Sequence, residues 1–484
     1  MSDRFGLNRR IPALVLLMAA VAAAVVGTRE ERSATTPTFS VSASGWMPAA
    51  PPIGGLTETW FCPGVPATGL DDVGGEVVVA NRTAEQMVGT ILLVDTERET
   101  RRLTLDIDGW SSATVDLDEL LPDRMVGAVI EIDGGGAIVE QRSIAPAGDS
   151  VAACANATSD GWYLADGFTV DGSLDEVVLT NPFEQTVVVN LEFATQEGSR
   201  RPASYRGLTV APRSVRVIDL GAPGAGAQSE PILAVAVEAT RGRLVVGRSQ
   251  TFLGGGRSGS QVTLAQPALR EQWWFADGAK GDGVTERYSI YNPTDDPVEV
   301  DAIVLGIAVP EGLEPIPVAS REVVTFDPGA AEDIPAGRFA IVFATSTNEA
   351  AIVVERASTR TVGDDRATSV LAGATPRQDG YLATTWYVGR GPSEPTTDAL
   401  VIHNGDLTEG VVSVSAVGSS GPVPVPSLQD VPVPGSSFTT IDLTDEVTLG
   451  RVLIVESTSR IFVERSFPSG RGDTRTSSWA VPAS

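Results

Sequence analysis

Three residue types on which many enzymes depend are nearly missing from this sequence. Its 484 residues include one histidine, His403, one lysine, Lys280, and two cysteines. A Ser-His-Asp or Cys-His site would have to use the single histidine, and one histidine with two paired cysteines cannot complete a zinc site. We therefore expect a non-enzymatic protein with no catalytic residues, no metal and no cofactor, in which His403 lies on the surface of a strand.

Positive charge is also scarce. Lysine and arginine together number 35 against 62 aspartates and glutamates, which gives a formal net charge of −27. Such a surface repels the phosphates of DNA or RNA, so we expect no nucleic-acid partner. The chain lacks a phosphate-binding loop and a dinucleotide fingerprint. Pairs of carboxylates are present, but nothing in the sequence distinguishes them from a solvated acidic surface.

Long apolar runs are absent beyond the first 30 residues. A basic tail at 1–10 precedes an apolar segment at 11–28, which is the order of features in an export signal. A charged cluster follows directly and makes a poor cleavage site. We therefore predict an uncleaved transmembrane anchor, a single-pass location in the cell membrane and an extracytoplasmic C-terminal part, with secretion after signal cleavage as the alternative. Residues 29–55, rich in Thr, Ser, Pro and Ala, predict a stalk.

An aromatic opening occurs four times in the rest of the chain. A tryptophan begins it, a second aromatic residue follows directly, and a glycine comes within a few residues. Self-similarity with a period of roughly 110 residues indicates four copies of one unit. The opening tryptophans are Trp60, Trp162, Trp273 and Trp386.

After its opening, each unit has a strand that ends in asparagine. Asparagine suits a turn at this place because its side chain can bond to the backbone two residues further on. These turn asparagines are Asn81, Asn181, Asn292 and Asn404. The four units that follow from the repeated features are 56–155, 156–267, 268–376 and 377–484.

Short alternating strands with turn signals every 8–12 residues are typical of an all-β sandwich. We predict four tandem immunoglobulin-like antiparallel β-sandwich units, joined by short linkers into a semi-rigid row behind the transmembrane helix and the stalk. A four-bladed propeller is the rival arrangement. A unit of about 100 residues argues against it, because it is far longer than one propeller blade.

Cys62 and Cys154 bracket the first unit. An even count in an exported chain predicts one disulfide, with two free buried thiols as the alternative. The bond would place the opening and closing strands of the unit side by side. Trp60 lies two residues from Cys62 and so shares its strand face, which predicts that Trp60 points into the core. By repetition, the other three opening tryptophans are core anchors too, and an Asp-Gly turn follows in the middle units.

A pair of charged residues recurs at one strand end, as Glu355-Arg356 and Glu464-Arg465. The other two units have Glu140-Gln141-Arg142 and Gly247-Arg248 there. We interpret these residues as the wet face of an alternating strand, with exposed cross-strand charge pairs. A row of ligand-binding arginines is the alternative.

The order of motifs resembles a known family. The matching residues are Trp162-Tyr163-Leu164-Ala165-Asp166-Gly167, Asn181-Pro182-Phe183, Cys62 and Cys154, behind an N-terminal anchor. Together they are similar to the actinobacterial exported proteins grouped as domain of unknown function 5719. The resemblance covers about residues 56–484. It implies no biochemical activity, so no catalytic residue is carried over from the family.

Two functions are consistent with these features. The first is a structural or binding scaffold at the bacterial cell envelope, held in the membrane through residues 11–28 and partnered by an envelope glycan or another envelope protein. The second is a carbohydrate-binding accessory protein of cell-wall or exopolysaccharide metabolism, or a carboxylate-based glycan hydrolase. The carbohydrate hypothesis relies on exposed tryptophans near the Asp-Gly turns, so burial of Trp162 and Trp273 would remove its main support.

Overall fold

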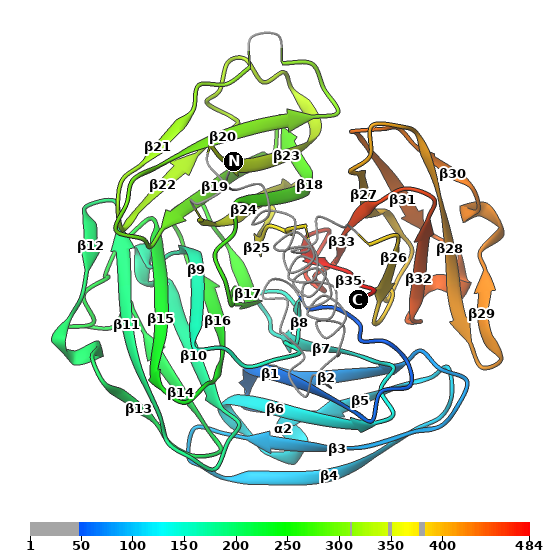
Figure 1. Ribbon diagram of the computed structural model, residues 1–484, viewed down its shortest axis with the longest axis horizontal. Helices are drawn as coiled ribbons and strands as arrows, with labels where there is room; N and C mark the ends of the chain where they lie inside the picture. The colour runs from blue at the N-terminus through cyan, green and yellow to red at the C-terminus, as the bar shows by residue number, and fades with distance from the viewer. Residues whose placement is uncertain (1–47, 310–311, 347–350, 377–382) are drawn as a thin grey trace, which may run out of the picture. The chain divides into compact units, whose positions relative to one another are not determined.

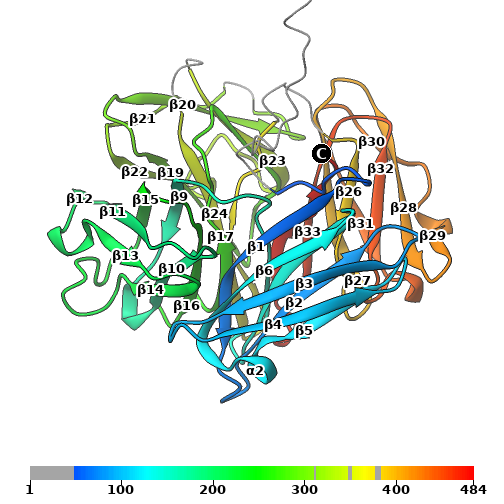
Figure 2. The ribbon, with the colours of Figure 1, turned by 60° about the horizontal axis from the view of Figure 1, so that its bottom comes forward.

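The computed structural model describes residues 48–309, 312–346, 351–376 and 383–484, which belong to one compact unit. In these residues the chain forms eight antiparallel sheets, two from each sequence repeat (Figure 1). The strands of the first repeat are divided between two sheets, of order β1-β6-β3-β4 and β5-β2-β7-β8. Figure 2 shows the strands of the first sheet side by side. The elements are β1 (Thr57–Ala67), β2 (Gly74–Asn81), β3 (Met87–Val94), β4 (Thr100–Ile107), β5 (Ser112–Asp116), α2 (Leu117–Leu120), β6 (Asp123–Asp133), β7 (Ala137–Ile144) and β8 (Ser150–Ala153).

The second repeat has the same plan, with two short strands, β12 and β13, where the first repeat has β4. Its sheets have the orders β12-β11-β15-β9, with β13 also paired to β11, and β14-β10-β16-β17. Two 3-10 turns, Val170–Gly172 and Ala203–Tyr205, interrupt the strands. The strands are β9 (Gly161–Gly167), β10 (Leu174–Asn181), β11 (Val187–Thr195), β12 (Gly198–Arg200), β13 (Leu208–Val210), β14 (Ser214–Asp219), β15 (Leu233–Arg241), β16 (Val245–Phe252) and β17 (Gly259–Leu264).

The third repeat has sheets of order β18-β23-β20-β21 and β22-β19-β24-β25. Its strands are β18 (Gln272–Lys280), β19 (Val284–Asn292), β20 (Val298–Leu305), β21 (Ile316–Val318), β22 (Glu322–Phe326), β23 (Gly337–Thr345), β24 (Val353–Val362) and β25 (Asp365–Ala372).

The fourth repeat has sheets of order β29-β28-β32-β26-β35, with β30 also paired to β28, and β31-β27-β33-β34. It contains 3-10 turns at Pro426–Leu428 and Glu446–Thr448. Its strands are β26 (Thr385–Val388), β27 (Thr396–Asn404), β28 (Gly410–Gly418), β29 (Gly421–Pro424), β30 (Val431–Val433), β31 (Phe438–Leu443), β32 (Leu453–Ser457), β33 (Ile461–Pro468), β34 (Arg475–Trp479) and β35 (Val481–Pro482).

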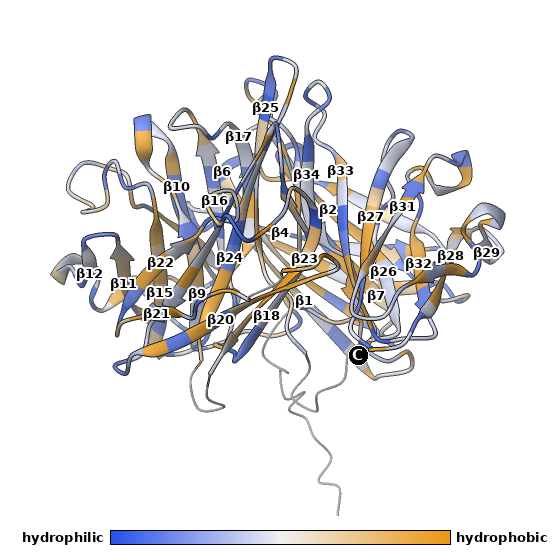
Figure 3. Ribbon diagram, turned by 90° about the horizontal axis from the view of Figure 1, so that it is seen from above, coloured by the Kyte–Doolittle hydropathy of each residue, from blue (hydrophilic) through white to orange (hydrophobic). Residues whose placement is uncertain are grey.

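Each repeat has its own hydrophobic core between its two sheets. Strands such as β11 alternate buried and half-buried residues, because successive side chains point to opposite faces of a sheet. The apolar residues therefore gather on the facing surfaces, and each core cluster contains the opening tryptophan of its repeat. Figure 3 shows the hydrophobic segments running along strands such as β1 and β23.

The four repeats close on one another. The last inner strand of each repeat contacts its neighbours in the cycle β8, β17, β25, β34 and back to β8. A cavity of about 60 Å³ lies among these four strands, which leaves room for no more than a few water molecules. The N-terminal segment also reaches the fourth repeat, because the Ala50 N–H donates to the Pro482 carbonyl at 2.8 Å. The eight sheets are the blades of an eight-bladed β-propeller.

The prediction of four immunoglobulin-like sandwiches in a semi-rigid row is therefore wrong. One repeat of about 100 residues is too long for a single blade because it supplies two blades. The length of the repeat therefore excludes four blades but not eight. The cycle of innermost strands contradicts the row. The predicted disulfide is present: Cys62 is bonded to Cys154, with Cα atoms 4.5 Å apart. The prediction that opening and closing segments lie side by side is also confirmed, since Phe61 pairs with Ala155 and Tyr387 with Val481.

The predicted location in the membrane needs correction. In the described part of the chain, no helix is both long enough and apolar enough to cross a bilayer. The residues expected to form the tail, the anchor and most of the stalk lie outside the described residues.

Candidate functional site at the junctions between repeats

The opening tryptophans lie inside their own repeats, where at most 1 % of each residue is exposed. Their indole N–H groups find acceptors there; that of Trp273, for example, donates to the Ile352 carbonyl at 2.9 Å. A buried and hydrogen-bonded indole cannot stack on a sugar ring. The carbohydrate hypothesis thereby loses the exposed tryptophans on which it was built. The four side chains are those of Trp60, Trp162, Trp273 and Trp386.

The second aromatic residue of each opening faces the other way and packs on the next repeat. Because neighbouring strand residues point to opposite faces, an inward tryptophan places its successor on the outer face. Trp274 of repeat 3 illustrates the contact: its ring lies 5.4 Å from that of Phe462 in repeat 4. The contacts run round the ring in one direction, from repeat 1 to 2, 2 to 3, 3 to 4 and 4 to 1. The residues are Phe61, Tyr163, Trp274 and Tyr387.

The turn asparagines hold the loop after each Asn-ended strand. In repeat 2 the Asn181 side-chain oxygen accepts the Phe183 N–H at 3.0 Å, and its amide group donates to the Gln185 carbonyl at 2.7 Å. The same pair of bonds recurs in the other repeats. The four asparagines are completely buried: Asn81, Asn181, Asn292 and Asn404.

The recurring charged residues are buried except Arg142, whose side chain is 23 % exposed and pairs with Glu76 on the neighbouring strand at 3.1 Å. The prediction of a wet strand face is therefore wrong for the others. An arginine of one repeat pairs with a glutamate of the next: Arg248 with Glu355 at 3.4 Å, and Arg465 with Glu140 at 2.9 Å. The pair between repeats 3 and 4 is Arg356 with Glu464. At most 1 % of any of these residues is exposed. Three of the junctions between repeats are thus held by ion pairs in a low-dielectric environment.

Each glutamate also accepts backbone N–H groups from the opening of the repeat before it. Glu355 takes those of Ala165 and Asp166 at 2.7 and 2.6 Å, and Glu140 takes that of Gly389 at 3.2 Å. These bonds satisfy the carboxylate lone pairs that the arginine leaves free, which a buried carboxylate requires. The glutamate is therefore shared between an arginine side chain and a backbone segment across the junction.

The junction between repeats 1 and 2 differs from the other three. Gln141 and Gly247 stand where the others have arginine and glutamate, and Gly64 donates its N–H to the Gln141 side chain at 3.1 Å. Pro63 stands where Ala165 donates to Glu355, and proline has no N–H to donate. A Cβ on Gly247 would lie 2.7 Å from the Pro63 ring. The arginine, the glutamate and one backbone N–H donor of the other junctions are thus all replaced here, by Gln141, Gly247 and Pro63.

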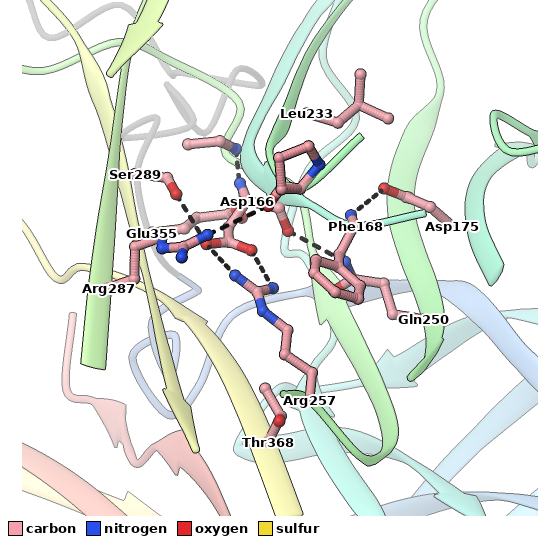
Figure 4. Close-up of polar contacts among 12 residues, drawn as sticks. Asp166, Phe168, Asp175, Leu233, Gln250, Arg257, Arg287, Ser289, Glu355 and Thr368 are labelled. Atoms are coloured by element: carbon pink, nitrogen blue, oxygen red, sulfur yellow. Dashed lines mark hydrogen bonds and ion pairs between the residues drawn. The ribbon is translucent and has the colours of Figure 1, made fainter. Parts of the chain in front are cut away.

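The aspartates of the two Asp-Gly pairs are not in exposed turns. Asp166 lies in β9, is fully buried, and accepts two bonds from Arg257 at 2.5 and 3.2 Å and one from the Ser289 hydroxyl at 2.7 Å (Figure 4). The Arg257 guanidinium rests 4.6 Å from the centre of the Phe168 ring, in a cation-π contact.

A second buried carboxylate, Asp175, lies beside this cluster. Its carboxylate is 3.1 Å from Arg248 and accepts the Phe168 N–H at 3.1 Å. Burial raises the pKa of Asp175 to about 6, although Arg248 acts in the opposite direction. Arg248 therefore connects Asp175 to Glu355, and so joins this cluster to the ion pair at the junction between repeats 2 and 3.

Repeat 3 carries a related cluster around Asp277. Its carboxylate pairs with Arg338 at 2.6 Å and Arg360 at 2.9 Å. Burial alone would raise the pKa of Asp277, but Arg360, Arg338 and Arg356 together hold it below the usual aspartate value. The Asp277 carboxylate is therefore enclosed and held by arginines from its own repeat.

His403 is also buried, which corrects its expected place on a strand surface. Its ring packs against both Trp274 and Phe462, with centroids 5.5 and 6.4 Å away. Burial lowers the pKa of His403 to about 4, so the ring is neutral at pH 7. Across the described ranges, no group of three or more His, Cys, Asp or Glu side chains is placed to hold a metal ion.

One open site was missed by the sequence reasoning. A cleft of about 700 Å³ lies at the junction between repeats 2 and 3, lined in part by Tyr163, Glu192 and Arg321. Its signal in the sequence is a departure from the repeat pattern, namely alanine and glycine at positions where the other repeats have larger residues. That signal requires the strand register, which the sequence alone does not supply.

The comparisons with other proteins add one finding. A search of curated proteins gives no match to this chain. Residues 136–256 match the model of a family described as a family of unknown function, DUF5719. The matched segment begins at the turn before β7, crosses the junction between repeats 1 and 2, and includes the Trp162 opening and the Asn181 turn. The resemblance found in the sequence is therefore confirmed over residues 136–256, where the chain matches the DUF5719 model.

Proposed function

We propose that this protein is a secreted, non-enzymatic binding scaffold that works outside the cytoplasm, at the cell envelope. The proposal is supported mainly by the way the ring is closed. Buried arginine-glutamate pairs join repeats 2 to 3, 3 to 4 and 4 to 1. A closed ring of rigid blades keeps the loops between strands in fixed positions, which suits a binding surface.

The disulfide supports the location. A bond between Cys62 and Cys154 persists in oxidising compartments and is rare in the cytosol. The formal charge of −27 keeps such a protein dissolved at high concentration and away from anionic polymers such as nucleic acids.

A carbohydrate-binding role is the second candidate. With the tryptophans buried, its support moves to the cleft between repeats 2 and 3, where Tyr163 is half-buried among arginine, glutamate and asparagine side chains. Polar side chains converging in a cleft are the usual composition of a small-ligand site.

The proposal is tested by mixing the full-length protein with insoluble envelope material from the source cells. We expect the protein to sediment with the envelope and to release no reducing sugars or free amino groups from it over many hours. Turnover that rises with protein concentration would overturn the non-enzymatic assignment. A protein that stays in the supernatant at all salt concentrations would overturn the scaffold role at the envelope.

A further inference from the structure

The cleft between repeats 2 and 3 has a sheet face as its floor. Tyr163 on β9, Ala236 on β15 and Glu192 on β11 are register partners and form one row across the sheet. Gly161, Glu238 and Asn190 form the row beside it. The opposite wall comes from the turns of repeat 3 and includes Pro293, Thr294 and Arg321.

The cleft exists because repeat 2 has small residues where the other repeats have larger ones. At the register position of Ala236 the others carry Val129, Val342 and Ile454. At the position of Gly161 they carry Thr59, Gln272 and Thr385.

The end of the first row differs as well. Glu192 stands where repeats 1 and 3 have Leu92 and Ile303. At the junction between repeats 1 and 2, Leu92 belongs to an apolar cluster that also contains Val178 and Val215 of repeat 2. Repeat 2 thus has the charged Glu192 where repeats 1 and 3 have apolar residues. The space that is filled by apolar packing between repeats 1 and 2 is an open cleft between repeats 2 and 3.

Charge is separated along this cleft. Asp160 and Glu238 lie at the β9 and β15 side, where the Ala239 N–H donates to the Asp160 carbonyl at 2.7 Å. Arg201, Arg206 and Arg321 lie toward the β11 edge. Three arginines in one cleft are notable in a chain whose net charge is −27, because they make a local anion-binding region on an acidic protein.

Two of these arginines are held in place by one carboxylate. Glu192 accepts Arg201 Nε at 2.5 Å through one oxygen and Arg321 Nη1 at 2.7 Å through the other. Arg321 comes from repeat 3, so this contact spans the junction. Arg321 also pairs with Asp295 through Nε at 2.8 Å and donates to the Pro293 carbonyl through Nη1 at 3.3 Å. A guanidinium has five N–H donors, so the Nη2 group of Arg321 and both Nη groups of Arg201 are left to bind a ligand carboxylate. Arg206 is exposed, and among the described residues no ion pair is recorded for it.

Tyr163 lies between the two charged regions. Burial raises the pKa of its phenol, and Glu238, Asp160 and Glu192 raise it further, so the hydroxyl keeps its proton and can donate. Its ring also provides an apolar surface beside Ala236, on which the C–H face of a sugar can rest.

We propose that this cleft binds an acidic saccharide, with the sugar carboxylate at Arg201, Arg206 and Arg321 and the sugar hydroxyls at Asp160, Glu238 and Asn190. The cleft volume of about 700 Å³ lies within the range usual for small-ligand sites. This inference rests on the proposed binding function and names its ligand class.

Isothermal titration calorimetry on the full-length protein tests the inference with three probes. They are a disaccharide containing glucuronate, the matched disaccharide with glucose in place of glucuronate, and glycylglycine. We expect the first to bind at a single site and the second to bind at least tenfold more weakly, because it lacks the charged group that the arginines recognise. Equal binding of the two saccharides, or binding of glycylglycine alone, would overturn the assignment.

Two variants place the binding in the cleft. Ala236→Val introduces the residue that repeats 1 and 3 carry at this position and should abolish binding by filling the space. Arg206→Ala removes an exposed side chain and should weaken glucuronate binding about tenfold with the melting temperature unchanged. Arg101→Ala, an exposed arginine on β4, is the matched control and should bind as the wild type does. Wild-type binding by both cleft variants would refute the location.

The outcomes separate this inference from the proposed function. If no probe binds while the protein still sediments with the envelope without turnover, the cleft assignment fails and the scaffold proposal stands. If the glucuronate disaccharide binds and is cleaved, the non-enzymatic proposal fails and the cleft assignment stands.

Discussion

The ion pair between Arg465 and Glu140 joins the last repeat to the first and makes a direct test of how the ring is held. The two residues are 325 positions apart in the chain, and each is 1 % exposed. We consider the variants Glu140→Gln, Arg465→Gln and the double change. Glutamine matches glutamate in size, so Glu140→Gln removes charge with little change in packing, whereas Arg465→Gln also removes two heavy atoms of the longer arginine side chain.

The expected magnitudes follow from the contacts. Glu140→Gln leaves the Arg465 charge buried and weakens the acceptor for the Gly389 N–H, while Arg465→Gln leaves a buried carboxylate. Each single change should lower the free energy of unfolding by about 3–5 kcal/mol, the usual cost of leaving one buried charge without its partner. The double variant removes both charges, so its loss should be well below the sum. The coupling free energy should reach about 2 kcal/mol or more.

Denaturant unfolding of the three variants and the wild type, followed by tryptophan fluorescence, measures these differences. The exposed pair of Arg102 and Glu131, 3.7 Å apart with side chains about half exposed, provides the control. Glu131→Gln should cost less than about 1 kcal/mol, because surface ion pairs contribute little. Additive losses in the double variant, or single losses no larger than that of Glu131→Gln, would show that the buried pair does not hold the ring.

Three further predictions concern other parts of the fold. Replacing Cys62 and Cys154 by serine should lower the free energy of unfolding by about 4–5 kcal/mol, the chain-entropy value for a loop of this length, and parallel unfolding curves under reducing and non-reducing conditions measure it. The folded-state pKa of Asp175, raised to about 6 from 3.8, means that the folded state holds this proton longer than the unfolded state, so stability falls as pH rises from about 4 to 6. The difference in the free energy of unfolding between Asp175→Asn and the wild type should therefore shift in favour of the variant by up to about 3 kcal/mol from pH 4 to pH 8. A difference that does not depend on pH would contradict this. For His403, whose pKa falls from 6.5 to about 4, the sign is opposite: stability is lost as pH falls through that window, so His403→Phe should resist acid better, as melting temperatures at pH 5 and pH 7.5 will show.

The local features of the fold follow from the sequence because they depend on neighbouring residues. The period-two patterns place the strands, the four asparagines mark the turns, and the shared strand face of Trp60 and Cys62 predicts an inward tryptophan. The family resemblance also comes from short motifs whose order is preserved.

The closure of the ring is not a local property. The partners Arg465 and Glu140 are separated by most of the chain, and the repeat period counts units without indicating that each one supplies two sheets. Alternating charge on a strand predicts a wet face when the strand borders water, but here that face borders another repeat. The buried pairs therefore have the sequence signature of an exposed surface.

Among the described residues, the junction between repeats 1 and 2 has an ion pair only at the exposed Arg124 with Glu176 and no fully buried pair, which gives the ring a defined start. When the chain emerges from its N-terminus, repeats 1 and 2 can dock at once, because Gln141, Gly247 and Pro63 bring no ion into the contact. Glu140, on the free side of repeat 1, has no counter-ion until the last hundred residues arrive with Arg465. In an unfinished chain, the face of repeat 1 that carries Glu140 therefore stays hydrated and negatively charged, which disfavours its association with another unfinished copy. Only the completed chain supplies Arg465, the cation with which Glu140 can be buried.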